Sequence, residues 1–168
     1  MNSIFTRRSV RSFLPKEVEA EKIEKLLQAA MQAPSAMNQQ PWEFIVVRGA
    51  ENLEKLSHFH VYATSMVGAD FAIIVLCNNE RLKSPLAWQQ DLGAATQNLL
   101  VEATELGLGT VWFGTAPHQP RMDYVREFCD LPEHMVPYSV IAGGYPKDPD
   151  ANHFKNRFDP SRVRYITE

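Results

Sequence analysis

The sequence predicts a layered α/β or α+β fold in which one sheet of four main strands carries helices on both faces. Three observations support this prediction. Helix-like and strand-like segments alternate along the chain, residues 70–78 form a continuous apolar run, and residues 86–106 present a long apolar helical face. The 168 residues suit a single domain, 1–168, because no repeat, low-complexity tract or long linker divides them.

Helices are expected where apolar residues recur at helical spacing, which occurs over 17–32, from about 86 to 106, and over 120–131. The segment 51–67 is helical in pattern only at its start. The longest helix has "SP" before it as a start signal and Gly107 after it as a stop signal. Its wide apolar face predicts a central position in the fold.

Strands are expected over 42–48, 70–78, 107–114 and 135–146. The first alternates apolar and polar residues, and the second is apolar throughout, which is typical of a strand buried on both faces. Residues 147–168 form a polar tail in which "RVRYIT" is able to pair as a strand. A domain of this size rarely leaves twenty residues unused after its last core strand, so we expect the tail to pack on another subunit.

Composition excludes several classes of function. The formal net charge of −3 argues against a dedicated nucleic-acid-binding protein. Cys77 and Cys129 are far apart and form no CxxC pair, so neither a metal site nor a disulfide framework is expected, and Cys77 reads as a core residue. The start of the chain has no signal-peptide pattern, and its longest apolar run, 71–77, is too short to span a membrane. A reducing, cytoplasmic setting is expected.

Two segments carry hydrogen-bonding and cationic side chains that suggest binding. "TRRSVRSF" (6–13) groups arginines and serines that suit a phosphate, although a solvated basic segment is an equal alternative. A phosphate site is favoured if Lys155 and Arg157 converge on it. "APSAMNQQPW" (33–42) offers amides that both donate and accept, which suits a flavin pyrimidine ring, whereas an ordinary turn-rich connector explains the same residues.

Two glycine-rich segments and the histidines are less specific. "GLGTVWFGTAP" (107–117) and "AGGYP" (142–146) allow the backbone to approach a flat ligand, but a tight turn explains each equally well. His58 and His60 do not share a helix face, so they do not predict a metal site. The chain has no nucleophile elbow, dinucleotide-binding glycine motif or phosphate-binding P-loop.

Taken in order, "RRSVRSF", "APSAMNQQPWEF", "DLGAATQNLLVEATELGLGTVW" and "GGYP" followed by "KNR" resemble the FMN-dependent nitroreductase family over nearly the whole chain. The length is similar to that of the compact members. The resemblance implies an α+β, nitroreductase-like fold with a central mixed or antiparallel sheet, helices on both faces, and a C-terminal tail exchanged across a homodimer. It also implies two FMN molecules in the subunit interface.

The resemblance also implies which residues bind FMN. Arg7, Arg8 and Ser9 would hold its phosphate and ribityl side, Arg11 would reach towards the ring, and Lys155 and Arg157 would meet the phosphate. The partner subunit would line FMN with Pro34, Ser35, Ala36 and Asn38, while Gly143 and Gly144 would lie over the other flavin face. Longer relatives carry an Asn and a Lys on a helix after the second strand, close to the flavin, and residues 51–70 contain no counterpart of this pair. The residues of the substrate pocket are therefore unassigned. Arg11 is the one expected cation near the pyrimidine edge.

The implied activity is ping-pong electron transfer from NADH or NADPH, through FMN, to electron-poor acceptors such as nitroaromatics or quinones. No catalytic side chain is predicted, because the chemistry takes place on the flavin. Flavin destruction and reductive dehalogenation are alternatives on the same scaffold, although both rely on lid segments for which this chain is short. A non-catalytic redox sensor or flavin store is a third alternative.

Overall fold

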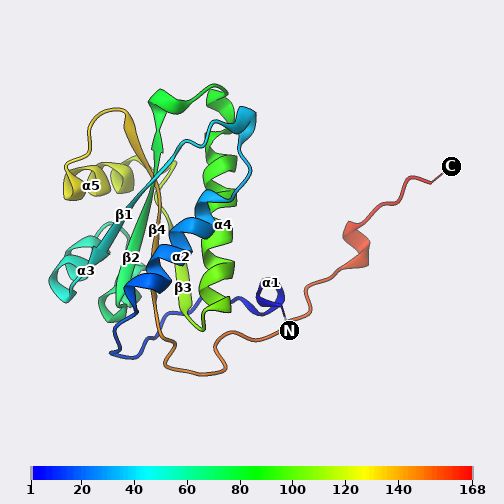
Figure 1. The fold of residues 1–168 in the computed structure, drawn as a ribbon, viewed down its shortest axis with the longest axis horizontal. Helices are drawn as coiled ribbons and strands as arrows, with labels where there is room; N and C mark the ends of the chain where they lie inside the picture. The colour runs from blue at the N-terminus through cyan, green and yellow to red at the C-terminus, as the bar shows by residue number, and fades with distance from the viewer. Residues whose placement is uncertain (1, 168) are drawn as a thin grey trace.

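The computed structural model describes residues 2–167, and its centre is a four-stranded sheet (Figure 1). The strands are β1 (Trp42–Arg48), β2 (Phe71–Asn78), β3 (Gly109–Gly114) and β4 (Met135–Gly144). Their order across the sheet is β1-β2-β4-β3, and every neighbouring pair is antiparallel. The α+β class is therefore confirmed, with the antiparallel form of the sheet. Parallel pairing within residues 2–167 is limited to an isolated bridge between Ser9 and Thr110.

Strand β2 explains the continuous apolar run in the sequence. All of its residues are buried. Because side chains alternate across a strand, Phe71 and Ile73 enter the core on one face of the sheet, while Ala72 and Ile74 enter the core on the other. Both faces of β2 are covered, so no position along it favours a polar residue. Cys77 lies in the first core, as predicted.

Helices cover both faces of the sheet (Figure 1). Helices α2 (Ala20–Met31) and α4 (Trp88–Glu105) share one core with the sheet, and α3 (Ala50–Ser57) and α5 (Gln119–Cys129) share the other. A single-turn helix, α1 (Ser3–Thr6), lies at the far end of α4, where the Ser3 hydroxyl donates to the Glu105 carboxylate. Sequence patterns did not predict α1, since four residues are too few to show a helical period. No helix of the described chain is long and apolar enough to cross a membrane.

The predicted elements agree with the observed ones, with shifts at their ends. Strand β1 has the predicted bounds, whereas α4 begins at Trp88 because Pro85–Ala87 forms a 3₁₀ turn. Gly107 follows α4 with a φ of +75°, a left-handed conformation that favours glycine and stops the helix. After α3 the chain forms turns and a 3₁₀ helix, Ala63–Gly68, where the helical pattern of the sequence had faded.

The last part of the chain leaves the body of the domain as an arm, residues 153–167 (Figure 1). Its regular structure within the described residues is one 3₁₀ turn, Pro160–Arg162. The segment 162–167, which the sequence suggested as a strand, pairs with no strand of its own chain. Exchange of the arm across a homodimer stays a prediction.

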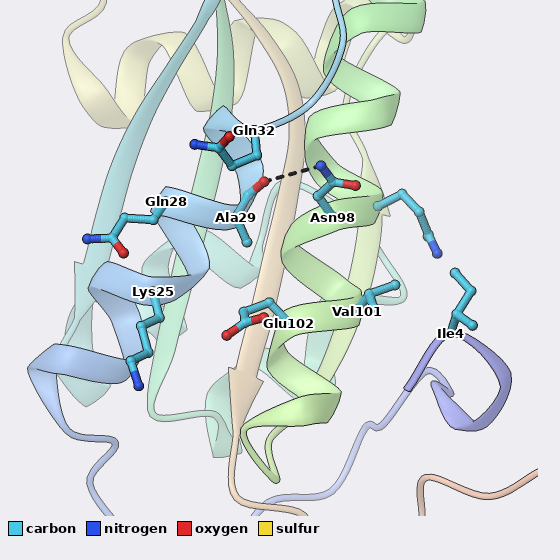
Figure 2. Close-up of a pocket in the computed structure, with 9 residues that line it drawn as sticks. Ile4, Lys25, Gln28, Ala29, Gln32, Asn98, Val101 and Glu102 are labelled. Atoms are coloured by element: carbon cyan, nitrogen blue, oxygen red, sulfur yellow. Dashed lines mark hydrogen bonds between the residues drawn. The ribbon is translucent and has the colours of Figure 1, made fainter. Parts of the chain in front are cut away.

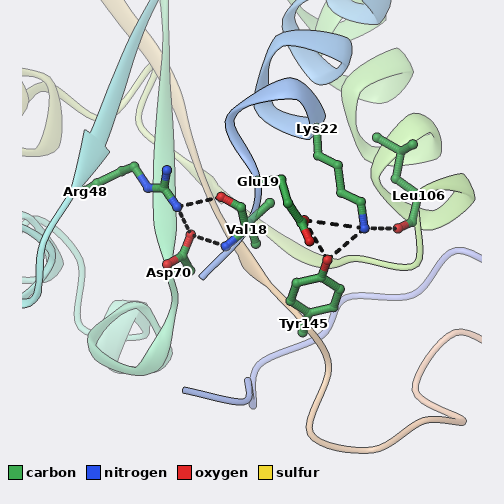
Figure 3. Close-up of polar contacts among 7 residues, drawn as sticks. All are labelled: Val18, Glu19, Lys22, Arg48, Asp70, Leu106 and Tyr145. Atoms are coloured by element: carbon green, nitrogen blue, oxygen red, sulfur yellow. Dashed lines mark hydrogen bonds and ion pairs between the residues drawn. The ribbon is translucent and has the colours of Figure 1, made fainter. Parts of the chain in front are cut away.

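Two polar clusters fasten the start of α2 and the residues before it to the sheet (Figure 3). At the end of β1, Arg48 donates to the Asp70 carboxylate at 2.6 Å and to the Val18 carbonyl at 2.7 Å, while the Val18 N–H donates to Asp70 at 3.1 Å. Just after β4, the Tyr145 hydroxyl accepts from Lys22 Nζ at 2.7 Å. These contacts fix the edge of the domain from which the chain continues towards the arm.

Gly143 tests how closely β4 packs against Phe71 of β2. A Cβ at position 143 would lie 2.4 Å from Cζ of Phe71, so the ring or the strand would have to move. We expect Gly143→Ala to lower the free energy of unfolding by about 1–3 kcal/mol, measured by urea denaturation. Gly68→Ala is the matched control, because no atom lies within 4 Å of its Cβ position, and we expect a change within about 0.5 kcal/mol. Equal losses in the two variants would contradict this account.

Candidate functional site

Both ends of the chain contribute cations to one hollow of about 360 Å³. Arg7 and Arg8 come from the segment after α1, and Lys155 and Arg157 come from the arm. We call this site the basic hollow. Its lining residues are Ile4, Phe5, Arg7, Arg8, Gln97, Phe154, Lys155, Asn156, Arg157 and Phe158. Two cations from each end of the chain therefore lie in one hollow, although almost the whole sequence separates the two pairs.

The positive charges of the basic hollow lack a counter-charge. Among residues 2–167, none of the four cations forms an ion pair with a carboxylate. The pKa of Arg7 is lowered, first by burial and then by the charges of Arg157 and Arg8. The buried Nε of Arg8 has no hydrogen-bond partner. A phosphate would offset the repulsion and accept from Nε, so these residues fit the phosphate of FMN.

Asn152 holds the N-terminal segment and the start of the arm together. Its Oδ1 accepts from the Arg8 N–H, and its Nδ2 donates to the Leu108 carbonyl, both at 3.0 Å. The Val10 N–H donates to the Thr110 carbonyl of β3 at 2.9 Å. Arg8 is therefore held between β3 and the arm. Asn152 was not predicted, because one polar residue in a polar tail forms no sequence pattern.

Ser9 and Arg11 continue along the edge of the sheet from the basic hollow. Ser9 forms the bridge to Thr110, and both residues line a depression of about 400 Å³ together with Lys147 and His153. Arg11 also lines a larger hollow of about 540 Å³ beside β3. The predicted N-terminal residues therefore follow one path along the sheet edge, from the basic hollow to the hollow beside β3.

The other predicted group, in the loop 33–41, lies at the opposite end of α4. We call this segment the amide loop. Asp91, buried in the first turn of α4, accepts from the Ala36 N–H at 2.9 Å and from Gln39 Nε2 at 2.6 Å. Gln39 is also buried, and its Oε1 accepts from the Ser84 N–H at 2.8 Å. The sequence did not single out Asp91 or the structural role of Gln39.

The backbone of the amide loop has an unusual conformation. Met37, Asn38 and Gln40 have positive φ angles of 52°, 51° and 45°, which cost about 1 kcal/mol or more each in residues other than glycine. The Ser35 hydroxyl accepts from the Gln40 N–H at 3.0 Å. Pro34 and Asn38 remain exposed. The loop thus presents polar groups to solvent on a backbone that is fixed from behind.

One chain does not bring the amide loop to the basic hollow. The loop is anchored at Asp91, and α1, next to the basic hollow, is anchored at Glu105. Fourteen residues separate the two anchors along α4, which corresponds to about 21 Å at 1.5 Å per residue. Figure 1 shows the two regions at opposite ends of α4. The predicted site is therefore present as two halves.

Gly143 and Gly144 have a different environment from the one expected. Both are buried within the sheet, Gly143 against the Phe71 ring and Gly144 against Phe13 and the backbone of Asp70. Neither lines the basic hollow or the hollow beside β3. Close packing explains their lack of side chains, and their contact with a flavin stays a prediction.

The thiols do not suit nucleophilic catalysis. Burial, with a smaller contribution from Asp91, raises the pKa of Cys77 to about 12, and burial raises the pKa of Cys129 to about 11. Both thiols therefore stay protonated at neutral pH. The described residues contain no group of three or more His, Cys, Asp or Glu placed to hold a metal ion.

The nitroreductase family model matches this chain over residues 4–64 and 60–145. The chain belongs to the nitroreductase family. A relative from Archaeoglobus fulgidus, provisionally named an NADH dehydrogenase/NAD(P)H nitroreductase, is 44% identical over 97% of this chain and 95% of its own length. The family assignment made from the sequence is thus confirmed.

Solved structures agree with this nitroreductase assignment. One from Clostridium acetobutylicum, provisionally named an NADH oxidase, is 47% identical with a TM-score of 0.96, covering 99% of this chain and 100% of that chain. A nitroreductase-like protein from Desulfovibrio desulfuricans, solved in complex with FMN, is 27% identical with a TM-score of 0.82, covering 99% and 95% of the two chains. The nitroreductase-like fold is confirmed.

Asp91 tests how the amide loop of this nitroreductase-family protein is held. In Asp91→Asn, the new amide group would face Gln39 Nε2, donor against donor. Gln39 is unable to turn its amide over, since its Oε1 already accepts from the Lys83 and Ser84 N–H groups. We expect a loss of about 1–3 kcal/mol in the free energy of unfolding. Asp123→Asn is the control, because Asp123 is exposed on α5, and we expect its free energy of unfolding to change by no more than about 0.5 kcal/mol. An Asp91→Asn variant with unchanged stability would contradict the role given to Asp91.

Proposed function

We propose that this nitroreductase-family oxidoreductase uses FMN to pass electrons from NADH or NADPH to electron-poor acceptors such as nitroaromatics or quinones. The observation that supports this most directly is the basic hollow, in which four cations meet without a carboxylate partner among the described residues. When bound, FMN supplies the redox chemistry, taking a hydride from the nucleotide and reducing the acceptor. The chain's own residues bind, orient and tune that group.

In this proposal, Arg7, Lys155 and Arg157 bind the phosphate by charge-assisted hydrogen bonds. Arg8 contributes its unpartnered Nε, and Ser9, next along the sheet edge, meets the ribityl chain. Burial and, after it, the charges of Arg157 and Arg8 lower the pKa of Arg7, and a bound phosphate would offset both effects by pairing with its guanidinium.

Arg11 acts at the ring. It lines the hollow beside β3, four residues beyond Arg7, and brings a guanidinium group there. A fixed positive charge at the pyrimidine edge stabilises negative charge that develops there during reduction. Arg11 thus orients the ring and favours electron uptake.

A second copy of the chain completes the site. Because the amide loop lies about 21 Å from α1 along α4, Pro34, Ser35, Ala36 and Asn38 reach FMN only from the partner subunit.

The groove between α2 and α4, of about 690 Å³, supports this homodimer (Figure 2). It combines apolar contacts from Ile4, Ala29 and Val101 with amides from Gln28, Gln32, Gln97 and Asn98, a mixture common at subunit interfaces.

The arm supports the same arrangement. Phe158, Tyr165 and Ile166 are exposed at 69%, 79% and 90%, so a single chain leaves these large side chains uncovered. Exchange onto a partner would bury them and fix Lys155 and Arg157 in the basic hollow. The free thiols Cys77 and Cys129 are compatible with the cytoplasmic setting that belongs to this proposal.

Flavin binding tests the role of the basic hollow. Lys155→Ala removes a cation that would contact the phosphate, so we expect FMN affinity to fall about 10- to 100-fold while riboflavin affinity is unchanged. Lys55→Ala on α3, which removes an exposed charge remote from the hollow, should leave both affinities unchanged. Titrations followed by flavin fluorescence give all four values. Equal FMN affinity in Lys155→Ala and the wild type would contradict the phosphate role.

Steady-state kinetics test the proposed reaction. The purified yellow protein should oxidise NADH or NADPH in the presence of menadione or a nitrofuran. Donor and acceptor that use one pocket in turn should give parallel lines in double-reciprocal plots. Intersecting lines would contradict a ping-pong mechanism in which donor and acceptor use one pocket in turn. A yellow protein without turnover would instead support a flavin store or redox sensor.

A further inference from the structure

The hollow beside β3 has a composition suited to a flat heterocycle. Its lining residues are Arg11, His60, Val61, Tyr62, Thr64, Val111, Trp112, Phe113 and Gly114, and its volume of about 540 Å³ lies in the range of small-molecule pockets. The lining combines planar side chains with one permanent cation and contains no carboxylate. A planar ring with hydrogen-bond acceptors along its edge matches this lining.

The hollow is also open and close to the basic hollow. β3 is an edge strand, and the loop opposite it exposes Val61 and Tyr62 at 80% and 77%. The four residue steps from Arg7 to Arg11 span at most about 14 Å. A single molecule with a phosphate at one end and a ring at the other is therefore able to occupy both hollows.

His60 lines the same hollow as Arg11, and its contacts fix the orientation of its imidazole ring. Its Nδ1 accepts from the Tyr62 N–H at 2.9 Å, so in the neutral imidazole the proton is on Nε2. The imidazole packs against Tyr62 and Phe113, with ring centroids 5.4 and 6.1 Å away. These contacts hold Nε2–H as a hydrogen-bond donor with a defined direction.

The surroundings of His60 keep it neutral. Burial lowers its pKa, and electrostatic repulsion from Arg121 and His118 at the start of α5 lowers it further. The Arg121 guanidinium is itself held next to the hollow, because Nη1 donates to the Gly114 carbonyl at 3.1 Å. At neutral pH the imidazole therefore offers one donor and no charge, whereas Arg11 supplies the charge.

We propose that His60, through Nε2–H, donates to an acceptor atom on the edge of the FMN ring seated beside β3, alongside Arg11. This assignment rests on the proposed function and adds a residue that the sequence did not single out for the cofactor. His60 would supply the uncharged hydrogen bond that fixes the tilt of the ring, while Arg11 supplies the electrostatic attraction.

The test compares FMN with riboflavin, which carries the same ring without the phosphate. His60→Phe keeps an aromatic ring against Phe113 but removes the donor, and His60→Gln restores a donor at a similar reach. His58→Phe is the matched control, because His58 is exposed and lies outside the hollow. Dissociation constants come from fluorescence titration, the visible spectrum of bound flavin reports on the ring, and circular dichroism checks folding.

We expect His60→Phe to weaken FMN and riboflavin by the same factor, roughly three- to tenfold, with a shifted flavin spectrum. His60→Gln should recover most of the affinity, and His58→Phe should match the wild type. Unchanged affinity for both flavins in His60→Phe, or a loss for FMN alone, would overturn the assignment while leaving the proposed function in place. A folded wild type that binds neither flavin would overturn both.

Discussion

The length of α4 is the constraint on which the site depends. The helix packs on the sheet through buried residues such as Leu92 and Leu99, so its two ends keep a fixed separation. Asp91 binds the amide loop at one end, and Glu105 binds Ser3 at the other. No local movement of a loop closes a distance of about 21 Å. This separation is the reason for proposing that the site forms between two chains.

The basic hollow adds an electrostatic reason for the same conclusion. Burial lowers the pKa of Arg7, the nearby charges of Arg157 and Arg8 lower it further, and the described residues offer these cations no carboxylate partner. Such an arrangement destabilises the free protein and becomes favourable when an anion binds. A ligand that binds only the folded protein stabilises it by mass action, so bound FMN would stabilise both the domain and the position of its arm.

The fold was predictable where local pattern reflects the core. The apolar run of β2 records burial on both faces, and the stop at Gly107 records a left-handed backbone. The four cations of the basic hollow were also named from the sequence, because "RRSVRSF" and "KNR" near the chain ends resemble segments of a known family. Their convergence in space had to come from the structure.

Other features were not predictable, because they depend on partners distant in sequence. The positive φ angles of the amide loop rely on Asp91, more than fifty residues away from it. Asn152 became significant only through its contacts with Arg8 and Leu108. Gly143 suggested a ligand-facing backbone, but its immediate neighbour is the ring of Phe71.

The most direct test of a shared site is subunit complementation. One chain would carry Arg7→Ala with Lys155→Ala, and a second chain would carry Ser35→Ala with Asn38→Ala. Mixed dimers, isolated with two different affinity tags, would be titrated with FMN. The account predicts one tight site per mixed dimer and none in either parent dimer, because one intact basic hollow then faces one intact amide loop. Mixed dimers that bind no more tightly than the parents would show that each site is built within a single chain.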